Sequence, residues 1–153
     1  MAGLINEMMD RLNDMYVNIS ELTELAHEKK DIIIKNDTEA LKAVTAKENT
    51  FVGRFQKAEK AASLILDDIA TVLNQNRAEL SLSKLGELIK EQEDYGAYTE
   101  IYNKLKQGME LLKERNSQNN LLIENALDYI DYTVNVLRST YGSGESGVLD
   151  TRN

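Results

Sequence analysis

Residues 3–35 read GLINEMMDRLNDMYVNISELTELAHEKKDIIIK, and this stretch decides the fold class. Its apolar residues recur at alternating intervals of three and four, which is the spacing of a heptad seam along one face of an α-helix. The seam residues are Ile5, Met8, Leu12, Met15, Ile19, Leu22, Ala26 and Ile33. Only Lys29 interrupts the rhythm. The stretch therefore predicts one long amphipathic helix, which must bury its apolar face against another helix.

A second apolar series follows a break at Lys35-Asn36-Asp37-Thr38, where Asn36 or Asp37 can cap the next helix. It predicts a helix from about residue 38 to about residue 75, with Glu48 inside the seam. The apolar members of this seam are Leu41, Val44, Phe51, Phe55, Ala58, Ala62, Ile65, Ile69 and Val72.

Two further helices are expected: a short one over residues 83–91 with a serine cap, and a long terminal one over residues 96–140. The terminal seam comprises Tyr102, Leu105, Met109, Leu112, Asn116, Asn119, Ile123, Ala126, Ile130, Thr133 and Leu137. The sequence thus predicts an all-α fold, an elongated antiparallel bundle of three long helices plus one short helix with coiled-coil-like packing. Residues 1–141 form the predicted helical domain, and residues 142–153 a flexible Gly/Ser-rich tail.

Composition narrows the functional classes. The chain has 153 residues, no proline, no cysteine and a net charge of −8. An acidic chain without clustered Lys and Arg is a poor partner for nucleic acid, and no apolar run is long enough to insert into a membrane. The first residues lack the basic and apolar segments of a signal peptide, so the expected location is the cytoplasm. A thiolate metal site is excluded, and we expect no cofactor.

The single histidine, His27, invites two chemical interpretations. Glu24 and His27 have the E-x-x-H spacing of ferritin-like di-iron bundles, but those sites need two such motifs and further glutamates. A histidine phosphotransfer domain is also helical, but Asp31 and the isoleucines after it do not suit access by a phosphoryl donor. An exposed or seam-flanking histidine is the simpler interpretation. Without a nucleophile–base pair or a glycine-rich phosphate loop, we expect no enzymatic activity.

The terminal helix becomes more apolar along its length. After Asn120 both flanks of the seam carry apolar residues, which is more than a two-helix contact requires. One explanation is that residues 122–141 lie centrally in a wider bundle and are also packed by the short helix. The other is that they form a surface for a helix of another protein. Asn116 and Asn119 fall on the seam, where a buried amide fixes register at a cost in stability.

The terminal segment resembles the C-terminal signature of FlgN-type flagellar export chaperones. In that family an N-x-x-N pair precedes a double leucine, a leucine- and tyrosine-rich helix follows, and Tyr-Gly closes it. The matching segments here are Asn116-Ser117-Gln118-Asn119-Asn120-Leu121-Leu122-Ile123, Ala126-Leu127-Asp128-Tyr129-Ile130 and Tyr141-Gly142. Two N-terminal segments agree as well, Leu22-x-x-Leu25 leading into Lys29-Lys30, and Thr45-Ala46-Lys47-Glu48.

The resemblance implies a cytoplasmic chaperone that binds the C-terminal helical segments of hook–filament junction proteins, prevents their premature assembly and delivers them to the flagellar type III export gate. It places client binding on the apolar part of the terminal helix, at Leu122, Ile123, Leu127, Ile130, Val134 and Leu137. Tyr141 matches the tyrosine that the family presents to the export gate.

Three questions stay open at this point. The alternative function is a structural or adaptor coiled-coil subunit that oligomerises through its terminal helix. The pattern leaves open whether the free chain forms a homodimer, and whether Tyr141 has any partner.

Overall fold

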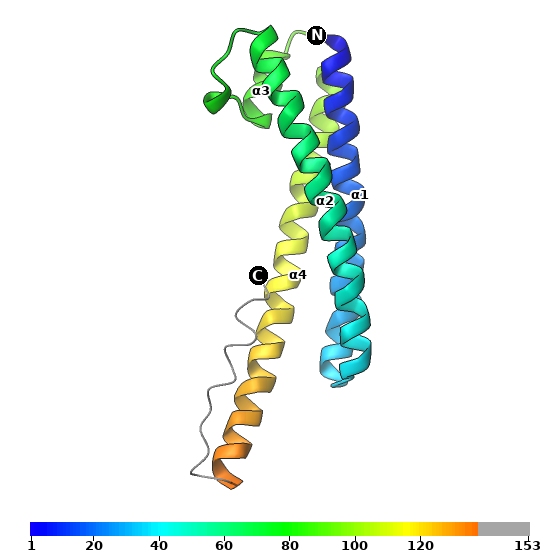
Figure 1. The fold of residues 1–153 in the computed structure, drawn as a ribbon, viewed down its shortest axis with the longest axis vertical. Coiled ribbons are helices and arrows are strands. Elements are labelled where there is room, and N and C mark those ends of the chain that lie inside the picture. The colour runs from blue at the N-terminus through cyan, green and yellow to red at the C-terminus, as the bar shows by residue number, and fades with distance from the viewer. Residues whose placement is uncertain (138–153) are drawn as a thin grey trace.

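The structure is a computed structural model that describes the backbone of residues 1–137 and the side chains of residues 1–125. Its elements are α1 (Ala2–Ile34), α2 (Thr38–Val72), the 3-10 helix η1 (Arg77–Glu79), α3 (Leu82–Leu88) and α4 (Tyr95–Leu137). α1 and α2 form an antiparallel hairpin, α3 lies at the end that holds the N-terminus, and α4 runs back alongside α1 (Figure 1). The predicted all-α fold of long, mutually packed helices is confirmed. No helix within residues 1–137 has the length and hydropathy to cross a membrane.

The heptad seam makes α1 the central helix of the bundle. All seam residues from Ile5 to Ala26 are buried, and Ile5, Met8 and Leu12 are fully so. α1 packs against both α2 and α4, whereas α2 and α4 pack much less closely against each other. Two partners therefore share the apolar surface of α1.

Two asparagines end the long helices of the hairpin. Asn36 and Asn74 have positive φ angles of 55° and 54°, in the left-handed region that asparagine tolerates better than other non-glycine residues. The residue after each asparagine donates its N–H back to a carbonyl of the last helical turn, which is the Schellman arrangement. Asp37 then caps α2, since its side chain accepts a hydrogen bond of 3.0 Å from the Ala40 N–H. The predicted break between these helices is confirmed.

The two charged residues that interrupt the seams of α1 and α2 meet each other. Lys29 Nζ lies 3.0 Å from Glu48 Oε1, and the two side chains are only 19 % and 16 % exposed. Each residue looks like a defect in its own helix, but together they form an ion pair across the hairpin. The pair fixes the register of α1 against α2, because a shift of one turn would bury both charges without a partner.

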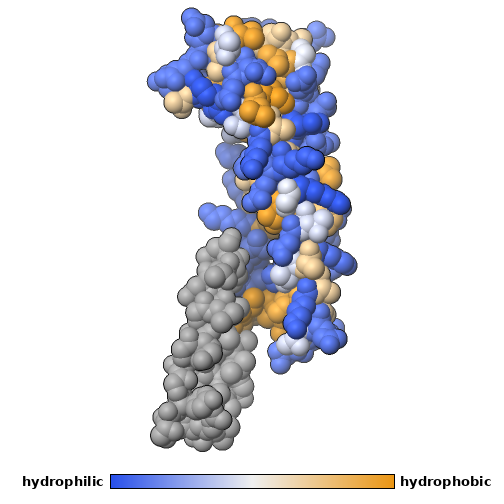
Figure 2. All heavy atoms as spheres, viewed as in Figure 1, coloured by the Kyte–Doolittle hydropathy of each residue, from blue (hydrophilic) through white to orange (hydrophobic). Residues whose placement is uncertain are grey.

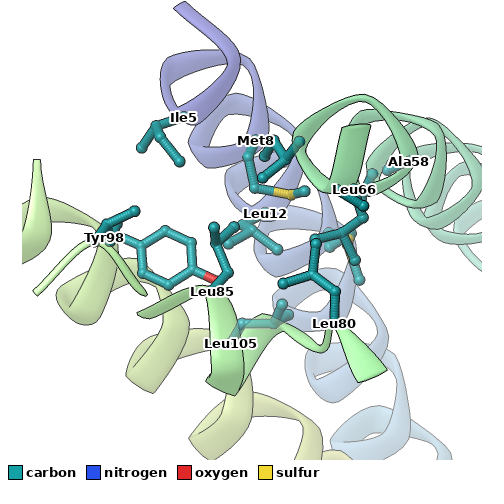
Figure 3. Packing of buried hydrophobic residues seen from close by; sticks show 14 of the residues in the cluster. Ile5, Met8, Leu12, Ala58, Leu66, Leu80, Leu85, Tyr98 and Leu105 are labelled. Atoms are coloured by element: carbon teal, nitrogen blue, oxygen red, sulfur yellow. The ribbon is translucent and has the colours of Figure 1, made fainter. Parts of the chain in front are cut away.

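The short connection folds over one end of the bundle. Ser81 caps α3 by accepting from the Lys84 N–H, and the buried Leu85 and Ile89 follow. The Tyr98 hydroxyl of α4 donates a 2.7 Å hydrogen bond to the Leu82 carbonyl. Figure 3 shows side chains of all four α-helices meeting in this core. The short helix was predicted at 83–91; it spans residues 82–88 because the chain turns after Leu88.

Part of the predicted α4 seam, the heptad row that includes Met109, is wrong. Met109 is 43 % exposed, while the preceding Gly108 faces α1: a Cβ at that position would lie 3.2 Å from Ile19 Cγ2 and 3.5 Å from Tyr16 Cε1. The seam therefore passes through the glycine, because the missing side chain lets α1 approach closely. In α2 the last residue of the predicted seam, Val72, is 57 % exposed instead of buried.

Candidate functional site

α4 is the longest helix and outreaches the hairpin. It has 43 residues, against 33 in α1 and 35 in α2. Figure 1 shows α4 diverging from α1 toward the hairpin turn and continuing beyond it. Among the described residues, the end of α4 therefore lacks the partner that the first part of the same helix has in α1.

Asn119 marks the point where α4 leaves α1. Its side chain is 3 % exposed, and its amide Nδ2 donates a 2.8 Å hydrogen bond to the Ala26 carbonyl. This contact satisfies a buried amide that would otherwise cost free energy. It also ties one turn of α4 to one turn of α1, so the predicted seam position of Asn119 is confirmed.

The seam position predicted for Asn116 is wrong, because its side chain is exposed. Asn116 belongs to the same heptad track as Met109, and that track turns away from α1. Arg115, one position earlier, is half-buried in its place. Of the two asparagines, only Asn119 can act on the register of α4.

Apolar side chains surround the point of divergence. On α4, Leu121 is 58 % exposed and both Leu122 and Ile123 are half-buried. On α1, Ile34 is 62 % exposed in the last turn, next to the half-buried Ile33. In Figure 2 apolar residues gather at this end of the hairpin. Leu121 is about 200° from Asn119 on the helical wheel of α4, so it faces away from α1. We call these five residues, which lie on both sides of the end of α4, the divergence surface.

The predicted client-binding residues fall partly on this surface. Leu122 and Ile123 belong to it. The side chains of Leu127, Ile130, Val134 and Leu137 lie outside the described residues, although the backbone of α4 is helical through Leu137. Tyr141 lies outside the described residues altogether. The sequence prediction missed the isoleucines of α1, although the run Ile32-Ile33-Ile34 at the end of that helix was a signal for them.

The alternative explanation for the apolar end of α4, packing by the short helix, is wrong. α3 is held at the opposite end of the bundle, where Leu82 bonds Tyr98 and Leu85 packs in the same core as Ile5 (Figures 1 and 3). It cannot reach residues 122–137. The short helix is therefore not the partner of this part of α4.

His27 is not part of a metal-binding cluster among the described residues. It is exposed on α1, and no group of three or more His, Cys, Asp or Glu side chains suited to a metal occurs in the described part of the chain. The surroundings of Glu24 and His27 thus give no support to the di-iron arrangement.

Comparison with known proteins gives one match. The sequence model of the FlgN protein family matches residues 1–147, which is nearly the whole chain. The search of curated proteins gave no match, and neither did the search of solved structures.

Proposed function

The chain belongs to the FlgN family of flagellar export chaperones, and we propose that its clients are the hook–filament junction proteins, bound through their C-terminal helical segments. The observation that carries this proposal is the divergence surface. There α4 leaves α1 after Asn119, with Leu121 58 % exposed and Ile34 62 % exposed. An amphipathic client helix that lies along α4 at this end would bury the apolar side chains that α1 leaves uncovered.

The physical mechanism needs no catalysis. A client helix on the divergence surface would be shielded from other subunits while it is bound, which prevents premature assembly. The affinity comes from removing apolar area from water, at roughly 25 cal/mol per Å². Because the surface is small and confined to the ends of α1 and α4, the complex can be moderate in affinity and release its client.

Titration calorimetry with C-terminal fragments of the junction proteins tests this proposal. We expect saturable one-to-one binding by the wild-type chain. Leu121→Asp should raise the dissociation constant roughly 30-fold, since burying a leucine is worth about 2 kcal/mol. The matched control is Leu64→Asp on α2, where the side chain is 66 % exposed and away from the divergence surface. Equal losses in the two variants, with helicity unchanged in both, would refute the assignment.

The same experiment addresses the alternative function. An adaptor that oligomerises through α4 would self-associate, lose that association with Leu121→Asp, and ignore the junction-protein fragments. Sedimentation of the same samples distinguishes this outcome from client binding.

We further propose that Tyr141 contacts the export gate, as the family resemblance implies. The test compares client binding with secretion in one variant. Tyr141→Ala should leave calorimetric client binding unchanged and reduce secretion of the junction proteins. Normal secretion of the junction proteins with Tyr141→Ala would show that Tyr141 is not needed at the export gate.

A further inference from the structure

The α1–α2 hairpin has a second face, on the side away from α4. An open groove runs between the two helices there, lined by Arg11, Asp14, Val17, Asn18, Arg54, Lys57, Ala58 and Ala61. On the helical wheel of α1, at about 100° per residue, these groove residues lie roughly 150° from Tyr16, Ile19 and Ala26, which contact α4. The groove is thus independent of the divergence surface.

Opposite charges follow the two edges of this face, along the groove and beyond it. On α1, Asp14, Glu21 and Glu28 follow one another at intervals of seven, so they form one acidic row. On α2 the corresponding edge is basic and consists of Lys47, Arg54 and Lys57. All six side chains are exposed. Arg11 also lines the groove on α1, where it pairs with Asp14.

The two rows lie at matching heights. The bond between Lys29 and Glu48 puts their neighbours Glu28 and Lys47 at one level. Asn18 and Arg54 line the same groove, so Glu21 lies within about one turn of Arg54. Among the ion pairs of the described residues, Asp14 pairs with Arg11 on its own helix, and the other five members of the rows have no ion-pair partner.

Small and apolar side chains line the middle of the groove. Val17 is 50 % exposed, and Ala58 and Ala61 present only methyl groups. Arg54 is held in place over the Phe51 ring, with its guanidinium carbon 5.2 Å from the ring centroid. Small side chains between charged walls suit the close approach of another helix pair.

We propose that this face binds a second copy of the chain. Consider a two-fold axis parallel to the helices and in front of the groove. It keeps every residue at its height and places α1 of one protomer opposite α2 of its partner. Each acidic row then faces a basic row, twice, as an isologous interface requires. Glu21 meets Arg54 of the partner subunit, and Glu28 meets Lys47 of the partner subunit.

The size of the face suits a weak dimer. The part of the hairpin level with residues 7–28 is about 32 Å long and two helices, about 20 Å, wide. It offers about 600 Å² per protomer, about 1,200 Å² in total, at the lower limit of specific interfaces. The dimer should therefore depend on concentration and weaken at high ionic strength, since exposed charges contribute much of the attraction. This dimer does not use α4, so the dimer proposal does not depend on the proposed function.

Two complementary charge-reversal variants, studied separately and mixed, test this proposal. The first variant is Glu21→Lys/Glu28→Lys, and the second is Arg54→Glu/Lys47→Glu. In a dimer of either variant, like charges face each other at four places, and we expect the dissociation constant to rise at least about 100-fold. In an equimolar mixture every pair is again complementary. Sedimentation equilibrium at low salt should therefore show dimers in the mixture and monomers in each variant alone.

Controls with the same change in net charge lie elsewhere on the chain. Glu91→Lys/Glu93→Lys matches the first variant, and Lys106→Glu/Lys113→Glu matches the second; all four positions are exposed. These controls should dimerise like the wild type.

Three results would overturn the proposal: a wild-type chain that stays monomeric up to about 1 mM, reversed variants that dimerise normally, or monomeric variants whose mixture does not dimerise. Restoration in the mixture cannot come from chains that failed to fold. A groove that instead accepts a helix of a different protein would appear as a monomeric wild type.

Discussion

Lys29→Met should destabilise the chain by much more than its position in a heptad seam suggests. A methionine suits an apolar seam, but the change leaves the Glu48 carboxylate, only 16 % exposed, without its partner at 3.0 Å. Breaking a fully buried pair costs about 3–5 kcal/mol. Because both side chains keep some contact with water, we expect about 2 kcal/mol here, which lowers the melting temperature of a chain of this size by about 4–8 °C.

The double variant Lys29→Met/Glu48→Leu completes the cycle. It removes both charges and keeps the volume, so its stability should return to within about 1 kcal/mol of the wild type. Lys84→Met is the control, since Lys84 and Glu87 pair on the surface with side chains 47 % and 70 % exposed. It should cost less than about 0.5 kcal/mol. Thermal unfolding followed by circular dichroism measures all of them. A double variant as unstable as Lys29→Met would show that the packing of Lys29, and not the pairing of its charge, stabilises the hairpin.

Three further predictions concern single positions. Gly53→Ala should raise the free energy of unfolding by about 1 kcal/mol, because a methyl group there meets nothing within 4 Å. Gly108→Ala should gain clearly less, because its methyl group would lie 3.2 Å from Ile19 of α1. Equal gains of the two variants in urea unfolding would contradict the close approach of α1 to Gly108. Asn119→Ala should lower the free energy of unfolding by about 1–2 kcal/mol, because it removes the buried hydrogen bond to the Ala26 carbonyl. Asn116→Ala should change it very little. Similar losses in the two variants would contradict the assignment of the seam. Tyr98→Phe should cost about 1 kcal/mol near neutral pH. Burial raises the pKa of Tyr98 above the ordinary tyrosine value of 10.0. Its neutral hydroxyl therefore favours folding below pH 10, and this contribution falls as the pH rises further. The wild type should lose more stability than Tyr98→Phe between pH 9 and pH 11, and parallel stability curves would refute this.

The sequence predicts the number, order and approximate bounds of the long helices, because a heptad seam is a strong local signal. It predicts each burial track less well. Met109 and Gly108 are neighbours, and a hydrophobicity pattern favours the methionine. The glycine faces α1 only because Tyr16 and Ile19 occupy the space where its side chain would lie. A pattern within one helix contains no information about the helix it meets.

The same limit applies to the charges in the seams. Lys29 and Glu48 each read as an interruption, and nothing in either helix alone shows that they pair across the hairpin. How far α4 extends beyond α1 depends on the position of α4 along α1, which is set by the close approach of Gly108 to Ile19 and by the contact of Asn119 with Ala26. The apolar character of Leu122 and Ile123 was visible in the sequence, whereas the contribution of Ile34 needed the relative placement of the helices.

The position of the far end of α4 has a consequence for how this chain can change over time. The far end of α4 lies away from the core in which all four α-helices meet, so the free energies of substitutions there and in the hairpin should be nearly additive. Substitutions at the far end of α4 then leave the hairpin as stable as before. The part of the chain that we assign to the client is free to acquire new specificity, while the rest continues to supply the folding free energy.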